Sequence, residues 1–369
     1  MAAADSKFPA GLAVYLDLVR VAAAIAVLLS HVLPVFGFGK LFPAYGHDAV
    51  VVFFVLSGFV IAYACDRKDT GLFDYALSRL VRLWSVAVPA LVLGMALWAL
   101  LPSPDAASAP SRSLRDAAGA SLANLLFLGE SWAGERLPPF NGPFWSLNYE
   151  AWYYAIYAAF IFTPGRRRWP VAALVCVLAG PAVMALAPCW FAGVALYHWR
   201  ARLQMSNAVA ASVFALSLLG YAAIGYYELA DWSRAWLKQA TAGQSYHLGA
   251  SQGLVADFLL TVVVAAHFAA AASLSPIGNA LLPVRRMVVG AASFTLSIYL
   301  YHSPLLALFH GGLGIGPSAG ATGLVFALLL LAPSILALGL LTEQKRHWLR
   351  SRAHAALMQP GRRLGREAR

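Results

Sequence analysis

Ten apolar runs, each near the length of a membrane-spanning helix, constrain this chain more than any other feature of its sequence. A helix needs roughly 20 apolar residues to cross a hydrocarbon layer about 30 Å thick. Since lipid offers no hydrogen bonds to the backbone, such runs must form helices. We therefore predict an all-α, polytopic membrane protein with about ten transmembrane helices. The predicted spans cover residues 12–34, 48–65, 83–102, 147–163, 170–187, 188–200, 208–227, 253–275, 288–310 and 320–342.

The composition argues against a soluble domain. Hydrophobic residues make up 60% and charged residues 12% of the 369 residues, whereas soluble domains average about 45–50% apolar and about 25% charged residues. The mean hydropathy of +0.68 leads to the same conclusion. The partner that this composition predicts is a lipid bilayer.

The placement of the 27 Lys and Arg residues predicts the orientation of the spans. With ten spans and a cytoplasmic N-terminus, 20 of them lie on the cytoplasmic side and six lie outside, which agrees with the positive-inside rule. A hairpin that turns at Pro188 keeps the arginines at 166–168 and Arg200 on the same side. We therefore predict two cytoplasmic termini in the inner (plasma) membrane. The net charge of +11 could also indicate nucleic-acid binding, but its distribution among loops on one side argues against that class.

The chain is expected to hold one membrane domain over residues 1–344 and a basic cytoplasmic tail over residues 345–369. The tail would form an interfacial helix or a disordered arm near anionic headgroups. The largest outer loop covers residues 103–146, and its weakly apolar stretch Leu122–Leu128 is too short to span. We predict no disulfide and no metal site, because the three cysteines have no paired spacing: Cys65, Cys176 and Cys189.

Ionisable side chains in the first span give the strongest functional signal. Such a group at the centre of a membrane helix costs roughly 2.5–3.5 kcal/mol, so it usually faces a cavity or a partner. Arg20 and His31 are eleven residues apart, which places them on nearly the same helix face and about 16 Å apart along the axis. Asp17 can pair with Arg20. The span therefore carries a polar stripe across the membrane, although a structural ion pair and a core histidine would give the same pattern.

Two further polar clusters lie at the ends of predicted spans. Arg79 and Arg82 share a helix face at the cytoplasmic entrance of the third span, where they could bind phosphates or simply anchor the span. Ser146 and Glu150 share a face one turn into the fourth span, so Glu150 is either stabilised by the helix dipole or a functional acid. Close helix packing is the expected role of two small residues in the second span, Ser57 and Gly58.

The ninth span brings a second histidine to the outer half of the membrane. His302 and Tyr301 are expected at a depth comparable with that of His31. Tyrosine at this depth is often part of the aromatic belt, and a hydrogen-bonded structural role is the alternative for His302. His267, alone in an apolar run, has the weakest functional case.

In this order, these segments resemble those of the acyltransferase 3 family of membrane O-acyltransferases. The resemblance covers essentially the whole chain. Many members carry a second Glu where this chain has Ala151. No esterase-like domain follows the last span, which leaves room for a partner protein acting outside. The resemblance rests on Leu16–Arg20 with His31, Phe53–Phe59, Arg79–Arg82, Trp145–Glu150, Ser297–His302 and Glu343.

The resemblance implies acyl-CoA, most simply acetyl-CoA, as a cytoplasmic co-substrate without any permanently bound cofactor. It also implies a saccharide or glycolipid hydroxyl as acceptor on the far side. By the match of motifs, His31 would be the catalytic histidine and Arg20 its CoA-handling partner. Arg79 and Arg82 would bind the CoA phosphates.

From these observations we predict an enzyme, an O-acyltransferase and most simply an O-acetyltransferase, that acts on a cell-surface or lipid-linked saccharide. A neutral imidazole suits general-base catalysis near pH 7, so His31 would activate the acceptor hydroxyl, with an acyl-histidine intermediate as the competing route. Glu150 is the second candidate catalytic group, and either Glu150 or His302 could orient His31 or bind the sugar. Trp145 and Ser146 are expected to contact the acceptor.

Two other classes of protein fit part of the pattern. A transporter or flippase for a lipid-linked glycan could use the buried ionisable groups as a relay. A purely structural membrane subunit gives no reason for the register of Arg20 and His31. Binding of acyl-CoA separates the enzyme from both alternatives.

Overall fold

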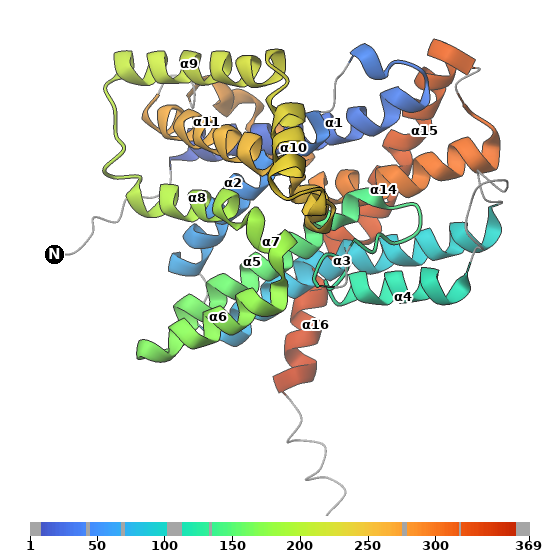
Figure 1. The fold of residues 1–369 in the computed structure, drawn as a ribbon, viewed down its shortest axis with the longest axis horizontal. Helices are drawn as coiled ribbons and strands as arrows, with labels where there is room; N and C mark the ends of the chain where they lie inside the picture. Colours follow the sequence, from blue (N-terminus) through green and yellow to red (C-terminus); the bar gives the residue numbers. More distant parts are fainter. Residues whose placement is uncertain are drawn as a thin grey trace, which may run out of the picture.

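A computed structural model describes residues 9–41, 45–67, 71–101, 113–132, 135–274, 279–316 and 319–358. Within these ranges the chain forms helices and turns without a strand, which confirms the all-α prediction (Figure 1). The longer helices are α1 (Ala10–Val35), α2 (Tyr45–Arg67), α3 (Leu72–Leu100), α5 (Trp145–Phe162), α9 (Asn207–Tyr226), α11 (Leu254–Ser273) and α15 (Gly320–Leu341). The shorter ones are α4 (Leu114–Leu125), α6 (Arg168–Ala179), α7 (Pro181–Ala185), α8 (Ala187–Trp199), α10 (Leu229–Ala240), α13 (Arg285–Ala292), α14 (Thr295–Ala307) and α16 (Arg346–Met358).

Several helices are long and apolar enough to cross a membrane, so the chain is a multi-pass membrane protein. Six helical stretches in the described ranges qualify by length and composition: Ala10–Val35, Tyr45–Arg67, Leu72–Leu100, Asn207–Tyr226, His247–Ser273 and Gly320–Met358. A seventh qualifies if the bent pair Asn279–Ala292 and Thr295–Gly312, which turns by 45°, counts as one span.

The other three predicted spans also form helices, but these do not qualify as spans. Helix α5 carries polar residues in its first two turns, among them Ser146, Asn148 and Glu150. The run at 170–187 is broken into α6, with 12 residues, and α7, with five, because Gly180 adopts a positive φ of 89°. Helix α8 has only 13 residues. The count of ten spans and the cytoplasmic termini therefore stay predictions.

Helix α2 is the centre of the bundle and packs closely against α8. A Cβ atom at Gly58 would lie 2.0 Å from the backbone oxygen of Trp190, and one at Gly193 would lie 1.9 Å from that of Val55. Only glycine therefore fits at either position, and the two backbones approach closely, as small residues allow in membrane helices. This contact fixes the position of the polar side chains that α2 carries.

Five helices surround the polar interior of the bundle. Helix α1 packs on α2 and α14, and α3 packs on α14 and α5. Helix α4 runs beside α3 without the length to span (Figure 1). The basic tail forms α16, which packs against α3 through the rings of Phe73 and His354, with centroids 5.8 Å apart. Residues 359–369 of the tail lie outside the described ranges.

Candidate active site

Two cavities meet inside the bundle. We call the first the arginine cavity, since Arg20 and Arg82 line it together with Glu150. We call the second the histidine cavity, because His31 and His47 line it. Val50 and Tyr299 line both cavities, so the two spaces adjoin. The histidine cavity is lined by Val27, Ser30, His31, Gly46, His47, Val50, Pro143, Trp145 and Tyr299.

The arginine cavity combines two guanidinium groups with a carboxylate. Arg20 Nη1 donates to Asp17 Oδ1 at 3.0 Å, so these two residues form the predicted pair. Glu150 Oε1 accepts a hydrogen bond from Ser57 Oγ at 2.6 Å and another from the Tyr154 hydroxyl. The cavity is therefore suited to an anion held by arginine, with the carboxylate of Glu150 fixed in its lining.

Ser57 does more than allow helix packing. Its hydroxyl donates to Glu150 and accepts a hydrogen bond from Trp190 Nε1 at 3.2 Å. Trp190 is fully buried. Ser57 thus links the α2–α8 contact to the carboxylate of the arginine cavity, a role that its place in the sequence did not suggest.

The two arginines at the start of α3 have different surroundings. Arg82 lines the arginine cavity and interacts electrostatically with Glu150 and Glu343. Arg79 instead lies over the ring of Tyr75, with its Cζ 5.0 Å from the ring centroid. Of the two residues predicted to bind phosphates, Arg82 is the one that faces the cavity shared with Arg20.

The imidazole of His31 has a defined tautomer. Its Nδ1 lies 2.8 Å from the carbonyl oxygen of Val27, which can only accept a hydrogen bond. In neutral His31 the proton therefore sits on Nδ1, and Nε2 carries the lone pair. His31 is exposed and lines the histidine cavity. This is the arrangement that a general base needs.

His302 lies directly behind His31. Their ring centroids are 5.0 Å apart, and His302 is fully buried. The Nδ1 atom of His302 lies 2.9 Å from the carbonyl oxygen of Ile298, so this nitrogen also donates. Its buried Nε2 has no hydrogen-bond partner among the described residues. Within the described residues the two imidazoles are therefore in ring contact without a hydrogen bond between them, and His302 limits the orientation of His31.

The predicted acceptor-contacting residues flank the junction of the cavities. Ser146 Oγ lies 2.6 Å from the Tyr299 hydroxyl, which donates to the carbonyl oxygen of Pro143 at 2.9 Å. Trp145 lines the histidine cavity. Tyr301, by contrast, is buried and donates to Thr342 Oγ1 at 3.1 Å. Tyr301 therefore supports the contact between α14 and the end of α15.

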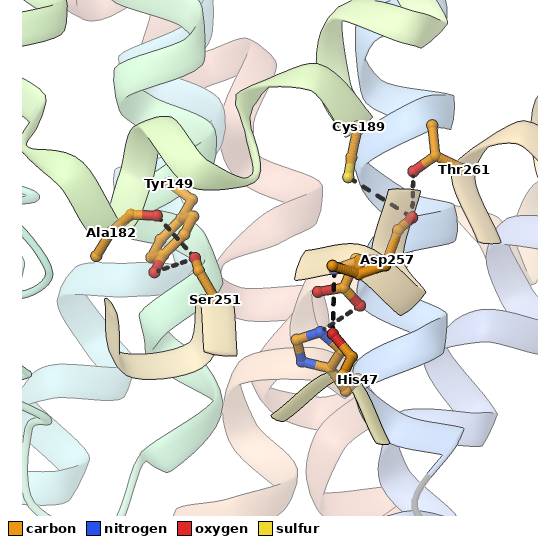
Figure 2. A network of polar contacts seen from close by, with 9 residues as sticks. His47, Tyr149, Ala182, Cys189, Ser251, Asp257 and Thr261 are labelled. Carbon is orange, nitrogen blue, oxygen red and sulfur yellow. Dashed lines mark hydrogen bonds and ion pairs between the residues drawn. The ribbon is translucent and has the colours of Figure 1, made fainter. Parts of the chain in front are cut away.

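Sequence reasoning missed a histidine–aspartate pair on the wall of the histidine cavity. Figure 2 shows His47 beside Asp257, and His47 Nε2 donates to Asp257 Oδ1 at 2.9 Å. Trp145 stacks on His47, with centroids 5.6 Å apart and ring planes 15° apart. His47 and Asp257 each lie at the start of an apolar run that is predicted to enter the membrane from the outer side. This shared depth was the signal in the sequence that could have indicated the pair.

Two other titratable groups lie away from the cavities. His267 is hydrogen-bonded to Tyr15 at 2.5 Å and to Ser217 at 2.8 Å, as a structural histidine would be. Glu130 lies in the loop between α4 and α5 and is buried. Burial, with a smaller contribution from Glu135, raises the pKa of Glu130 to about 8. Neither residue has a place in the chemistry of the cavities.

Comparisons with known proteins show the family of the chain. Searches of curated proteins and of solved structures found no match to the chain. A family model described as an acyltransferase domain, that of the acyltransferase 3 family, matches residues 13–343. The match covers all the residues of both cavities. The chain therefore belongs to the acyltransferase 3 family and is a membrane acyltransferase.

Proposed function

We propose that this acyltransferase moves an acyl group, most simply acetyl, from cytoplasmic acyl-CoA to a hydroxyl of a cell-surface or lipid-linked saccharide. The observation that carries the proposal is that the two cavities lie side by side, with Val50 and Tyr299 lining both. A site with two arginines is thus next to a site with a histidine whose Nε2 can take a proton. An acyl donor and a hydroxyl acceptor need such a pair of adjoining sites.

The arginine cavity is the proposed donor site. Arg20 and Arg82 supply guanidinium donors for the phosphates of CoA, since planar guanidinium groups bind phosphate oxygens in pairs. Apolar residues of α2 and α14, including Phe53 and Leu296, line the rest of the cavity and suit the pantetheine arm. Arg20 and His31 are eleven positions apart on α1, a rise of about 16 Å, so an extended arm would bring the thioester toward the histidine cavity.

The histidine cavity is the proposed site of transfer. His31 Nε2 removes the proton of the acceptor hydroxyl, and the hydroxyl oxygen attacks the thioester carbonyl carbon. The new C–O bond forms, the C–S bond breaks, and the proton passes from His31 to the departing CoA thiolate. His302 packs against the imidazole of His31 and holds its orientation.

Glu150 has a supporting role in this scheme. Its carboxylate is fixed by Ser57 and Tyr154 on the wall of the arginine cavity, and it does not line the histidine cavity. We therefore assign Glu150 to positioning the arginines and the donor rather than to proton transfer. The acceptor lies against Trp145 and Tyr299.

The orientation of the protein follows from the charge distribution. Lys and Arg gather in loops on one side of the predicted spans, which favours an inner-membrane protein with its donor site facing the cytoplasm. Arg82 lies in the first half of α3, and His31 near the end of α1. The donor would thus enter from the cytoplasm, and the acceptor would be acylated on the far side.

Inside-out vesicles from the native host, supplied with acetyl-labelled acetyl-CoA, test this function. Label should enter the glycan or lipid-linked fraction with the wild type and fall by roughly 10²–10⁴-fold with His31→Ala, the usual contribution of acid–base catalysis. His267→Ala is the matched control, because His267 is a hydrogen-bonded histidine outside both cavities. Unchanged transfer in well-expressed His31→Ala would refute the assignment. A protein that binds no acyl-CoA of any chain length would instead be the transporter.

A further inference from the structure

His47 and Asp257 form a second polar group beside the proposed base. They lie in the first turns of α2 and α11, and 210 residues separate them in the sequence. Asp257 is buried, and its place at a helix start stabilises the carboxylate. The hydrogen bond to Asp257 Oδ1 occupies Nε2 of His47. Among the described residues, nothing bonds the other ring nitrogen, Nδ1, which is left for a ligand.

The pair is held against the wall that carries His31. A Cβ atom at Gly46 would lie 2.2 Å from Ser30 Oγ and 3.9 Å from His31 Cε1, so the start of α2 packs in close contact with this part of α1. His47 follows Gly46 and lines the same cavity as His31. The stacked ring of Trp145 fixes the plane of the His47 imidazole. Both histidines therefore face one space in fixed orientations.

A purely structural ion pair would look different. Asp257 Oδ2 is buried and has no hydrogen-bond partner in the part of the chain that the structure describes. The side chain of His47 keeps 27% of its surface exposed, and that surface borders the cavity. A pair that only joined α2 to α11 would be closed off from the cavity and fully satisfied.

We propose that His47, oriented by Asp257, binds a second hydroxyl of the acceptor and thereby places the reacting hydroxyl at Nε2 of His31. This inference rests on the proposed function and narrows its acceptor to a polyol such as a sugar ring, which offers neighbouring hydroxyls. His47 is a binding residue in this account, and Asp257 is a positioning residue. A single alcohol would have no group for His47 to bind.

The test uses purified protein, labelled acetyl-CoA and a dilution series of lipid-linked glycans extracted from the native host. His47→Gln can still donate to Asp257 but loses the nitrogen at the Nδ1 position. We expect the amount of glycan needed for half-maximal transfer to rise about tenfold, the cost of one hydrogen bond to a buried group. The acetyl-CoA concentration for half-maximal transfer should stay unchanged, because the donor binds in the other cavity. Asp257→Asn should shift the glycan requirement in the same direction, and His267→Gln should not.

The outcomes separate this inference from the function on which it rests. If His31→Ala abolishes transfer but His47→Gln and Asp257→Asn leave the glycan requirement within about twofold of the wild type, His47 does not bind the acceptor. If both variants change the donor and glycan requirements equally, the pair supports the fold and the inference is wrong. If the wild type transfers no acyl group, the proposed function fails and this inference fails with it.

Discussion

The hydroxyl of Ser57 joins three helices, so its removal should weaken the bundle and the donor site together. It donates to Glu150 on α5 at 2.6 Å and accepts from Trp190 on α8 at 3.2 Å. Ser57→Ala removes a hydrogen bond to a carboxylate, typically about 1.5–3 kcal/mol, and leaves a buried indole N–H without a partner at about 1–3 kcal/mol. Local relaxation recovers part of this, so we expect a loss of about 3 kcal/mol.

Thermal unfolding of the purified protein in detergent measures this loss. A domain of about 150–250 residues shifts by about 2–4 °C per kcal/mol and a larger one by less, so for this chain the melting temperature should fall by at most about 6–12 °C. Ser85→Ala is the matched control, because Ser85 is also buried in a helix but its hydroxyl bonds only to the carbonyl oxygen of Arg82 within α3, at 3.0 Å. Equal melting temperatures for the two variants would refute the network that we assign to Ser57.

Three further predictions follow from individual contacts. Gly58→Ala should cost about 1–3 kcal/mol by overpacking, while Gly71→Ala, where a Cβ atom meets nothing within 4 Å, should not lower the melting temperature. Arg82→Ala should weaken acetyl-CoA binding by about 10–100-fold, as the loss of a charged hydrogen bond does; an equal loss in Arg79→Ala would contradict the different surroundings of the two side chains. Because the pKa of Glu130 is raised from 4.5 to about 8, the folded protein holds a proton that the unfolded chain releases, so stability should fall as pH rises between these values. Glu130→Gln should flatten that part of a melting-temperature profile, and an unchanged slope would contradict the assignment.

The apolar pattern of the sequence predicted the helices well. Every predicted span coincides with a helix or a pair of helices, because burial in lipid and backbone hydrogen bonding impose the same period on all of them. The apolar pattern predicted the positions of breaks between helices less well. Gly180, with its positive φ, splits the run at 170–187, and a hydropathy pattern does not register a single backbone turn.

The candidate site was predictable only where its residues share one helix. The Asp17–Arg20 pair follows from the helical period, and the structure contains it. The meeting of His31 and His302 was predicted only as a similar depth, since depth alone does not say which faces of two helices turn toward each other. The pair of His47 and Asp257 depends on the packing of α2 against α11, which no local pattern encodes.

For Arg79 and Arg82, the helical period predicted a shared site, but only Arg82 lines the arginine cavity. Their spacing places them on one helix face, yet Tyr75 lies one turn before Arg79 and its ring holds the guanidinium. Arg82 lines the cavity with Arg20 and interacts there with Tyr154 and Glu150. Helical periodicity predicts the face of the helix from which a side chain leaves. The position of its charged group also depends on nearby aromatic rings, as Tyr75 shows for the guanidinium of Arg79.

The central claim, that donor and acceptor meet where the two cavities join, is tested most directly at Val50. This buried residue lines both cavities, and Val50→Phe would add bulk where the two cavities adjoin. In the vesicle assay we predict acetyl-CoA binding within about twofold of the wild type and acetyl transfer reduced by about tenfold or more, since a displacement of about 1 Å can cost about 10²-fold in rate. Full transfer in a variant that binds acetyl-CoA normally would contradict a path through this junction.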